Sequence, residues 1–502
     1  MSAPGRPQAL GLKTKLAYGF GSAAYGIKDN GLQTLLLLFY NQIVGLRSDL
    51  VGMAIFAALV LDAFVDPAIG RWTDRTSSRW GRRHPFMVAA AIPVGVLYVL
   101  LWNPPRTSST ETMIFLVVVA VLARTAISTY EIPSSALAPE LTADYDERTS
   151  LLGYRYLFSW IGGMTMAFVT FVFIMAPSPD YPVGQLNPVS YRVYSWVAAV
   201  AMVVAILVSA WGTPVPARRV GAPPAHDGVP RPAIWSTFKN KAFIMLMASG
   251  VFSFASTGLT FALSTYFNTY LWALDASVFG IFTAALLIGA VGAFWLAQSL
   301  SRRFGKKIAS IWVMASYPPV AIAPYALWAA GAFPHAGDAA LLPLLMVFMA
   351  LAATLGTAGA ILGASMMSDV VEDAELRTGE RSEGTYFAGS FFMQKCVSGL
   401  GLFLAGGMLS IVNFPAGAAP GTVPAPVLSQ LVLLYVGVLI ALGAFATWFI
   451  ICFPLGGRGE HETRLARLSA IASHALTLPE SEAEYPASDS PPPHGPAETS
   501  IP

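Results

Sequence analysis

Long runs of apolar residues dominate this sequence and limit what it can fold into. They include Met87–Trp102, Met113–Leu122, Val197–Trp211 and Leu431–Ile451. A helix needs about 20 such residues to cross a bilayer. Unpaired backbone groups are not tolerated against lipid, and the runs lack the alternation of barrel strands, so each span is predicted to be a helix. The sequence therefore predicts an all-α membrane protein.

The composition agrees with this class. The 502 residues are 55% hydrophobic and 12% charged, whereas a soluble domain is about a quarter charged. The two cysteines, Cys396 and Cys452, both lie in apolar segments and form no disulfide or metal-binding pattern. The first apolar run has no small-residue cleavage site, so we expect it to be a first transmembrane helix and not a cleaved signal peptide.

The hydropathy pattern predicts twelve transmembrane helices in two groups of six. The expected spans are 16–45, 48–73, 85–103, 110–139, 151–177, 190–212, 241–272, 277–300, 308–332, 340–369, 384–413 and 426–453. They divide the chain into an N-terminal six-helix bundle, a Pro-, Gly- and Arg-rich cytoplasmic linker, a C-terminal six-helix bundle and a disordered cytoplasmic tail. The expected limits are 1–212, 213–240, 241–454 and 455–502.

The distribution of Lys and Arg predicts the orientation. With twelve spans, the two termini and the even-numbered loops share one side, and that side holds most of the 30 basic residues. The opposite side has Arg47, Arg106 and Arg192. Positively charged loops stay in the cytoplasm, so both termini are expected inside a cell membrane.

Two loop motifs repeat in the chain. The sequence RWGRR at 79–83 recurs 224 residues later as RFGKK at 303–307. Glu140 and the charged residues after it recur 229 residues later, from Asp369, which is nearly the same offset. The repeats fall at equivalent loops of the predicted spans. They indicate two duplicated six-helix units related by an axis along the membrane normal.

Eight ionisable residues fall well inside the predicted spans. A charge at the centre of a membrane helix costs about 2.5–3.5 kcal/mol on insertion scales, which makes each a candidate functional residue. Seven are in the first half of the chain, so the first half is expected to carry the polar site. The eight are Lys28, Asp29, Asp62, Asp66, Arg124, Glu131, Arg155 and Lys395.

Asp62 and Asp66 are spaced to share one face of their helix, about 6 Å apart. Two carboxylates that close in a poorly hydrated cavity cannot both stay charged without a cation. Either one keeps a proton or a bound Na⁺ neutralises the pair, and both outcomes make an ion-coupling site. The alternative for Asp66 is pairing with Arg71 and Arg75 at the cytoplasmic end of the span.

The other buried charges leave alternatives open. Neighbouring residues on a helix do not face each other, so Lys28 and Asp29 are expected to find separate partners, although a pair at a kink is the alternative. An ion pair between Glu131 and Arg155 across a first-half cavity is either structural or functional. Arg124 has no readable role. Lys395 has no local partner and is expected to reach the first-half carboxylates.

The loop 70–83 combines an aspartate with several arginines at one junction between spans. It serves either topology, by holding the loop inside, or gating, through ion pairs that break during alternating access. The candidate gating residues are Asp74, Arg75, Arg79 and Arg82.

Together these motifs resemble those of the glycoside–pentoside–hexuronide:cation symporters, the melibiose-permease branch of the major facilitator superfamily. The resemblance covers about residues 13–454. It rests on GIKD at 26–29, DAFVDP at 62–67, TDRTSSRWGRRHP at 73–85, EIP at 131–133 and the isolated Lys395.

The resemblance implies a monomeric symporter of the major facilitator fold that couples a sugar or glycoside to H⁺ or Na⁺, without another cofactor. It implies cation binding by Asp62, Asp66 and Ser128, with Lys395 linking the second half to them. The implied sugar-binding residues are Lys28, Asp29, Glu131 and Arg155.

Two residues depart from the melibiose-permease pattern. Val65 stands where those proteins have an asparagine that contributes to Na⁺ selectivity, and Ser135 stands where they have a tryptophan that stacks on the sugar. Tyr130, Tyr154 and Trp160 are candidate replacements for that ring. Vertebrate relatives of this group carry lysolipids, so a lysolipid or other amphiphile is the alternative substrate.

Enzymes and nucleic-acid binders are excluded on different grounds. No HExxH, GxSxG or phosphate-binding loop occurs at a plausible site, and the six histidines are scattered over predicted loops and the tail. The basic residues are explained by membrane topology, which leaves no separate signal for nucleic acid.

Overall fold

The computed structural model describes residues 10–76, 78–105, 107–142, 145–214, 240–274, 276–378 and 383–455. These residues form helices and the turns that join them. The first group of helices comprises α1 (Leu12–Phe20), α2 (Ala23–Thr34), α3 (Leu36–Leu38), the π-helix η1 (Phe39–Ile43), α4 (Ser48–Arg75), α5 (His84–Leu101), α6 (Ser109–Leu141), α7 (Tyr145–Val169), the π-helix η2 (Thr170–Ile174), the short 3₁₀ helix η3 (Gly184–Leu186) and α8 (Pro188–Gly212).

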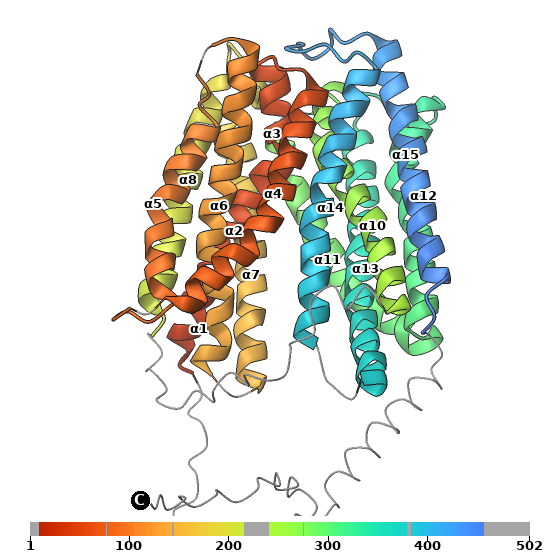
Figure 1. Ribbon diagram of the computed structural model, residues 1–502. Coiled ribbons are helices and arrows are strands. Elements are labelled where there is room, and N and C mark those ends of the chain that lie inside the picture. The colour runs from red at the N-terminus through yellow and green to blue at the C-terminus, as the bar shows by residue number, and fades with distance from the viewer. Residues whose placement is uncertain are drawn as a thin grey trace, which may run out of the picture.

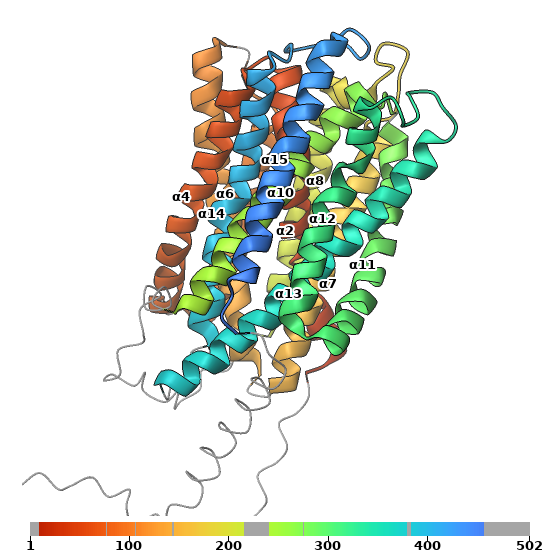
Figure 2. The ribbon, with the colours of Figure 1, turned by 90° about the vertical axis from the view of Figure 1, so that its right-hand side faces the viewer.

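The second group begins after the linker. It comprises α10 (Lys241–Tyr266), the π-helix η4 (Phe267–Leu271), α11 (Ala276–Phe304), α12 (Lys306–Ala329), α13 (Leu341–Thr378), α14 (Glu383–Ile411) and α15 (Ala425–Ile451). The helices of the first group lie together on one side of the molecule and those of the second on the other (Figure 1). The 90° view shows the same rods running roughly parallel to one axis (Figure 2).

Eight helices in the described part of the chain are long and apolar enough to cross a membrane. They begin at Ser48, His84, Ser109, Ser150, Pro188, Lys241, Leu341 and Ala425. Helices α11, α12 and α14 have 29, 24 and 29 residues. At about 1.5 Å per residue, these three also have the length of a bilayer.

The first span differs from the single helix expected over 16–45. It is divided into α1, α2, α3 and η1, with the first break at Gly21 and Ser22. A β-carbon on Gly21 would lie 1.7 Å from the Tyr130 hydroxyl, and one on Gly26 would lie 1.9 Å from the Ser159 carbonyl oxygen. The chain therefore needs glycine where this span presses against α6 and α7, and glycine also weakens the helix there.

Helix α13 extends beyond the expected span of 340–369. It continues to Thr378 and includes the charged residues from Asp369 to Arg377. Hydropathy marks where a helix leaves the apolar layer, but backbone hydrogen bonding continues into water. The linker from 215 to 239 and the tail from 456 lie outside the described residues, so the boundaries predicted there stay predictions.

Helices α4 and α14 connect the two groups along a seam of small residues. A β-carbon on Gly406 would lie 2.3 Å from the Ser48 carbonyl oxygen, and one on Gly399 would lie 2.6 Å from the Leu59 side chain. Gly406 therefore lies beside the start of α4 and Gly399 further along it, which makes the two helices antiparallel. Both views place α4 next to α14 (Figures 1 and 2).

Gln42 joins the two groups at the end that the sequence predicts to be extracellular. Its side-chain oxygen accepts hydrogen bonds from the Tyr270 hydroxyl and the Ala418 backbone N–H, both at 3.0 Å. Its amide nitrogen donates to the Pro415 carbonyl at 3.2 Å. Nearby, Tyr266 donates to Asn41 at 2.9 Å. This end of the bundle is held together by polar side chains.

Candidate functional site

The Asp62 carboxylate lies in the middle of α4 and is only 4% exposed. Ser128 Oγ donates a hydrogen bond to Asp62 Oδ1 at 3.1 Å, and Arg124 Nη1 lies 3.6 Å from Asp62 Oδ2. A carboxylate this deeply buried is tolerated only with charge compensation and hydrogen bonds. The structure supplies both from α6.

The spacing along α6 explains why one helix can do this. Arg124, Ser128 and Glu131 are four and three residues apart, so they lie along one face. A capping box starts the helix, in which the Ser108 side chain accepts from the Glu111 N–H and the Glu111 carboxylate accepts from the Ser108 N–H. The contacts with Asp62 and Arg155 show that this polar face is turned toward α4 and α7.

Asp66 lies one turn beyond Asp62 and is partly exposed. Pro67 follows it inside the helix and has no N–H to donate to the carbonyl of residue 63. That carbonyl oxygen lies on the helix between the two aspartates in sequence. The stretch 62–67 thus offers two carboxylates and a backbone oxygen, which together with Ser128 are ligands of the kind that hard cations take.

Glu131 and Arg155 form the ion pair that the sequence predicted as one alternative, and it links α6 to α7. Arg155 Nη1 also donates to Ser134 Oγ at 2.7 Å, and its guanidinium lies 5.4 Å from the centre of the Tyr18 ring. Glu131 Oε2 is buried without a hydrogen-bond partner in the described part of the chain. A buried acceptor of this kind is costly unless some donor reaches it.

Lys28 and Asp29 form the neighbouring pair that the sequence left as the alternative to separate partners. Lys28 Nζ lies 3.7 Å from Asp29 Oδ1 and 4.1 Å from the centre of the Tyr25 ring. The lysine stem is long enough to turn back toward Asp29 while its ammonium remains over the aromatic face. Asp29 Oδ2 also accepts from Gln33 Nε2 at 2.6 Å, one turn further along α2.

Exposure divides these charges into two sets. The side chains of Asp29 and Glu131 are 34% and 23% exposed, whereas those of Lys28 and Asp62 are 7% and 4% exposed. The carboxylates of Asp29 and Glu131 are therefore partly accessible, whereas that of Asp62 is enclosed by the helices.

Lys395 lies in α14, but its side chain is outside the part that the structure describes. Its backbone position follows from the antiparallel seam, because Gly399 lies beside Leu59. Residue 395 lies one helical turn before Gly399 in α14, and Asp62 lies about one turn after Leu59 in α4. Because the two helices are antiparallel, residue 395 lies at the level of Asp62. The proposed coupling role of Lys395 is consistent with this level and stays a prediction.

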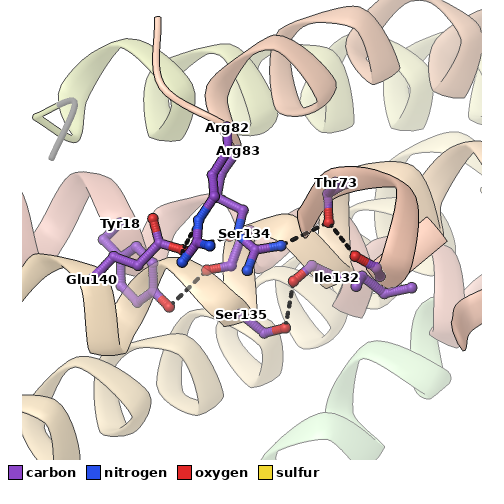
Figure 3. Close-up of polar contacts among 9 residues, drawn as sticks. Tyr18, Thr73, Arg82, Arg83, Ile132, Ser134, Ser135 and Glu140 are labelled. Carbon is purple, nitrogen blue, oxygen red and sulfur yellow. Dashed lines mark hydrogen bonds and ion pairs between the residues drawn. The ribbon is translucent and has the colours of Figure 1, made fainter. Parts of the chain in front are cut away.

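The gating candidates converge only in part. Arg82 Nη2 lies 2.7 Å from Glu140 Oε1, at the end of α6, and Arg83 Nε lies 3.0 Å from the same oxygen. Arg83 Nη1 also donates to Thr73 Oγ1 at 2.7 Å, which ties the loop to α4 (Figure 3). We call Thr73, Arg82, Arg83 and Glu140 the Glu140 cluster.

The other gating candidates lie outside this cluster. Arg75 and Arg79 are exposed, and the Arg79 guanidinium lies 5.4 Å from the centre of the Trp80 ring. The side chain of Asp74 is outside the described part of the chain. Sequence reasoning did not assign Arg83 or Glu140 to the gate, although the repeat that contains Glu140 was a usable signal.

The second group of helices has an equivalent of the Glu140 cluster. Lys306 and Asp369 occupy the positions that correspond to Arg82 and Glu140 in the loop repeats, and their side chains lie 2.7 Å apart. Lys307, which corresponds to Arg83, donates to the Phe453 carbonyl at 2.7 Å. The duplicated motifs therefore form the same kind of contact twice.

Two contacts of the site were missed by sequence reasoning. Arg124 contacts Asp62, and Ser134 brings Arg155 together with Tyr18. The Tyr18 hydroxyl donates to the Ser134 carbonyl at 2.9 Å, as Figure 3 shows. Neither contact has a signature in local spacing.

Of the rings considered for stacking on a sugar, Tyr130 is fully buried, whereas Trp160 is 55% exposed.

Comparison with known proteins gives the family and the fold of this chain. The family described as "MFS/sugar transport protein" matches residues 17–457. The inner membrane symporter YicJ of Escherichia coli is 26% identical over 412 residues, which cover 82% of this chain and 85% of YicJ. The putative glycoside/cation symporter YagG of the same organism is 25% identical over 448 residues, 87% of this chain and 92% of YagG.

A solved structure also shares the fold. The crystal structure of a D-xylose-proton symporter superposes with a TM-score of 0.61 at 12% sequence identity, covering 86% of this chain and 96% of the other. At this identity the likeness shows the fold alone. The family match, the membrane-spanning helices and the fold together make this chain a membrane transporter of the major facilitator superfamily, a member of the MFS/sugar transport protein family.

Proposed function

We propose that this protein is a secondary active transporter that couples the movement of a monovalent cation, H⁺ or Na⁺, to uptake of a sugar or glycoside by alternating access. The observation that carries the proposal is the buried Asp62 carboxylate, held by Ser128 and Arg124 beside the more exposed Glu131–Arg155 pair. Two relatives of this protein, YicJ and YagG, are named as symporters, and YagG is described as a putative glycoside/cation symporter.

The cation site in this proposal is formed by Asp62, Asp66 and Ser128. Without a cation, the two carboxylates leave excess negative charge in a region of low dielectric constant, which disfavours closing the cavity around the solute. With the cation bound, the charge is reduced and closure costs less. Movement of the solute is thereby tied to movement of the ion.

The solute site is formed by Asp29, Glu131, Lys28 and Arg155. Carboxylate and guanidinium groups make paired hydrogen bonds to neighbouring hydroxyl groups, which favours a sugar. The buried Glu131 Oε2 would gain the donor that it lacks when a hydroxyl group binds. Asp29 is exposed enough to accept from a second hydroxyl.

The architecture in this proposal is twelve transmembrane helices in two six-helix bundles, 1–212 and 241–454, that rock about the α4–α14 seam. Both termini and the linker 213–240 are cytoplasmic, and the protein works as a monomer in the cell membrane. The paired loop contacts Arg82–Glu140 and Lys306–Asp369 support the duplication. Arg75, Arg79, Arg82 and Asp74 act at the cytoplasmic gate, together with Glu140.

The test uses the purified protein in sealed vesicles with imposed H⁺ or Na⁺ gradients. Asp62→Asn and Asp66→Asn are expected to abolish accumulation of a labelled glycoside against its gradient, because the variants cannot exchange the charge of the carboxylate pair. Exchange of solute between equal pools is the control and should persist. Unchanged gradient-driven accumulation in both variants would contradict the coupling site. If the wild type transports a labelled lysolipid and no glycoside, the substrate is a lysolipid or another amphiphile.

A further inference from the structure

Arg124 contacts the proposed cation site but is neither a cation ligand nor a solute ligand in the symport scheme above, and it is one of the most buried charges in the described chain. It is 5% exposed in the middle of α6. Its Nη1 lies 3.6 Å from Asp62 Oδ2, on the face that also carries Ser128. A guanidinium group keeps its charge at all accessible pH values, so this charge is a permanent part of the site.

The distance defines what Arg124 can do there. Tight charge-assisted hydrogen bonds between a guanidinium and a carboxylate are about 2.7–2.9 Å long. At 3.6 Å, Arg124 compensates the charge of Asp62 without holding its oxygen in a tight bond. The other oxygen of Asp62 accepts from Ser128. The arrangement resembles a cation already placed at the carboxylate, but attached to the chain.

The oxygen ligands for a metal ion are nevertheless present. Asp62, Asp66, Ser128 and the carbonyl of residue 63, to which Pro67 cannot donate, lie within one turn of α4 and the facing turn of α6. A Na⁺ ion among these oxygens would lie within a few ångströms of the Arg124 guanidinium. Like charges at that distance repel strongly in a buried site. A proton needs no such space, since it binds to one carboxylate oxygen.

We propose that Arg124 is a tethered counter-cation that determines ion specificity: it excludes Na⁺ from the Asp62–Asp66 pair and leaves the proton as the coupling ion. This inference rests on the proposed symport function. Helices α6 and α14 pack against α4, and near the level of Asp66 they carry Arg124 and Glu131 on α6 and Lys395 on α14, whose side chain is outside the described part. Helix α4 itself carries Asp62, Arg71 and Arg75 there. The other charged residues of these three helices lie nearer the helix ends: Asp49, Asp74, Glu111, Glu140 and Glu383.

The experiment is a titration of the purified full-length protein with NaCl by isothermal calorimetry, with choline chloride holding the ionic strength constant. The wild type is expected to show no Na⁺-specific heat. Arg124→Gln is expected to gain saturable Na⁺ binding, because the oxygen ligands lose the competing charge. The double variant Arg124→Gln with Asp62→Asn should lose that binding again.

Arg124→Lys is the matched control, because it keeps the positive charge, and it should remain without Na⁺ binding. Lys395→Gln tests whether the other basic residue is the one that excludes Na⁺. The inference is overturned if Arg124→Gln gains no Na⁺ binding, or if Lys395→Gln gains it in its place. The inference is also overturned if the wild type binds Na⁺ and Asp62→Asn removes that binding. This outcome needs no Arg124 variant.

Gradient experiments on the same proteins separate this inference from the proposed function. In vesicles, a pH gradient alone should drive solute uptake by the wild type, and a Na⁺ gradient should drive it only in Arg124→Gln. If neither gradient drives uptake by any variant, the symport proposal fails. The Na⁺ titration still decides the role of Arg124, since it needs no transported solute.

Discussion

The two groups of helices resemble each other at the predicted cytoplasmic end and differ in the middle. At that end, Arg82 pairs with Glu140 in the first group, and Lys306 pairs with Asp369 at the corresponding place in the second. In the middle, the first group carries the contacts Lys28–Asp29, Arg124–Asp62 and Arg155–Glu131. In the second group, the ion pairs among the described residues lie near the ends of α12 and α13.

The difference separates structural charges from functional ones. Pairs at the helix ends reach water and cost little to keep, so both copies of the duplicated unit have retained them. Charges at the level of the membrane centre are expensive in either copy. Their accumulation in one copy therefore indicates a site that the transporter uses once, and the second copy supplies mainly packing against it.

The largest stability effect is expected at the Glu131–Arg155 pair. Glu131→Ala leaves the buried Arg155 guanidinium without its carboxylate, and breaking a buried pair costs about 3–5 kcal/mol. Glu131→Gln keeps a hydrogen-bond acceptor at the same place and should cost less. Thermal unfolding of the purified protein in detergent measures both. Equal melting temperatures for wild type and Glu131→Ala would show that the pair is not a structural element of the first group.

A smaller and unequal effect is expected at the two loop contacts. Glu140→Ala should destabilise the protein by about 2–3 kcal/mol, because Glu140 serves two arginines and Arg83 is buried. Asp369→Ala should cost about 1 kcal/mol, since the Lys306 side chain is 28% exposed. Melting temperatures of the two variants give the order. If Asp369→Ala lowers the melting temperature more than Glu140→Ala does, the second group depends more on its loop contact than the first.

At the opposite end, Gln42→Leu is expected to weaken the contact between the groups by about 1–2 kcal/mol, because it removes the acceptor of Tyr270 and Ala418. The amide hydrogens of the Ala418 region should exchange roughly ten times faster for each 1.4 kcal/mol lost. Asn103→Leu is the matched control. Its amide donates to Val99 and Ser195 inside the first group, so the Ala418 region should exchange unchanged.

The smallest effect is expected for Arg377→Ala. Arg377 and Asp373 are four residues apart on α13, and the arginine side chain is 63% exposed. The Asp373 side chain is only 12% exposed, but the arginine reaches water, and a solvent-screened pair of this spacing contributes about 0.3–0.5 kcal/mol. The melting temperature should hardly change. A loss comparable to that of Glu140→Ala would mean that the ends of the second group are as dependent on ion pairs as those of the first.

Much of the candidate site was predictable from the sequence, because it depends on local patterns. The spacing of Asp62 and Asp66 on one helix and the candidacy of Ser128 come from the chain alone or from the motifs around them. The Glu131–Arg155 contact was expected as an alternative. The Lys28–Asp29 contact was the less favoured alternative, since spacing rules describe where side chains leave the helix and not how far a flexible lysine can turn back.

Sequence patterns alone were enough to show that this chain is helical, lies in a membrane and carries buried charge in its first half. These properties follow from hydropathy and from the high cost of unpaired charge in lipid, which act on each segment separately. Three features required the packed structure: Arg124 contacts Asp62, Arg83 joins Glu140 to Thr73, and the first span breaks at Gly21 and Ser22. Those outcomes depend on how helices far apart in sequence pack face to face. The residue pattern of a single helix does not show which helix packs against it.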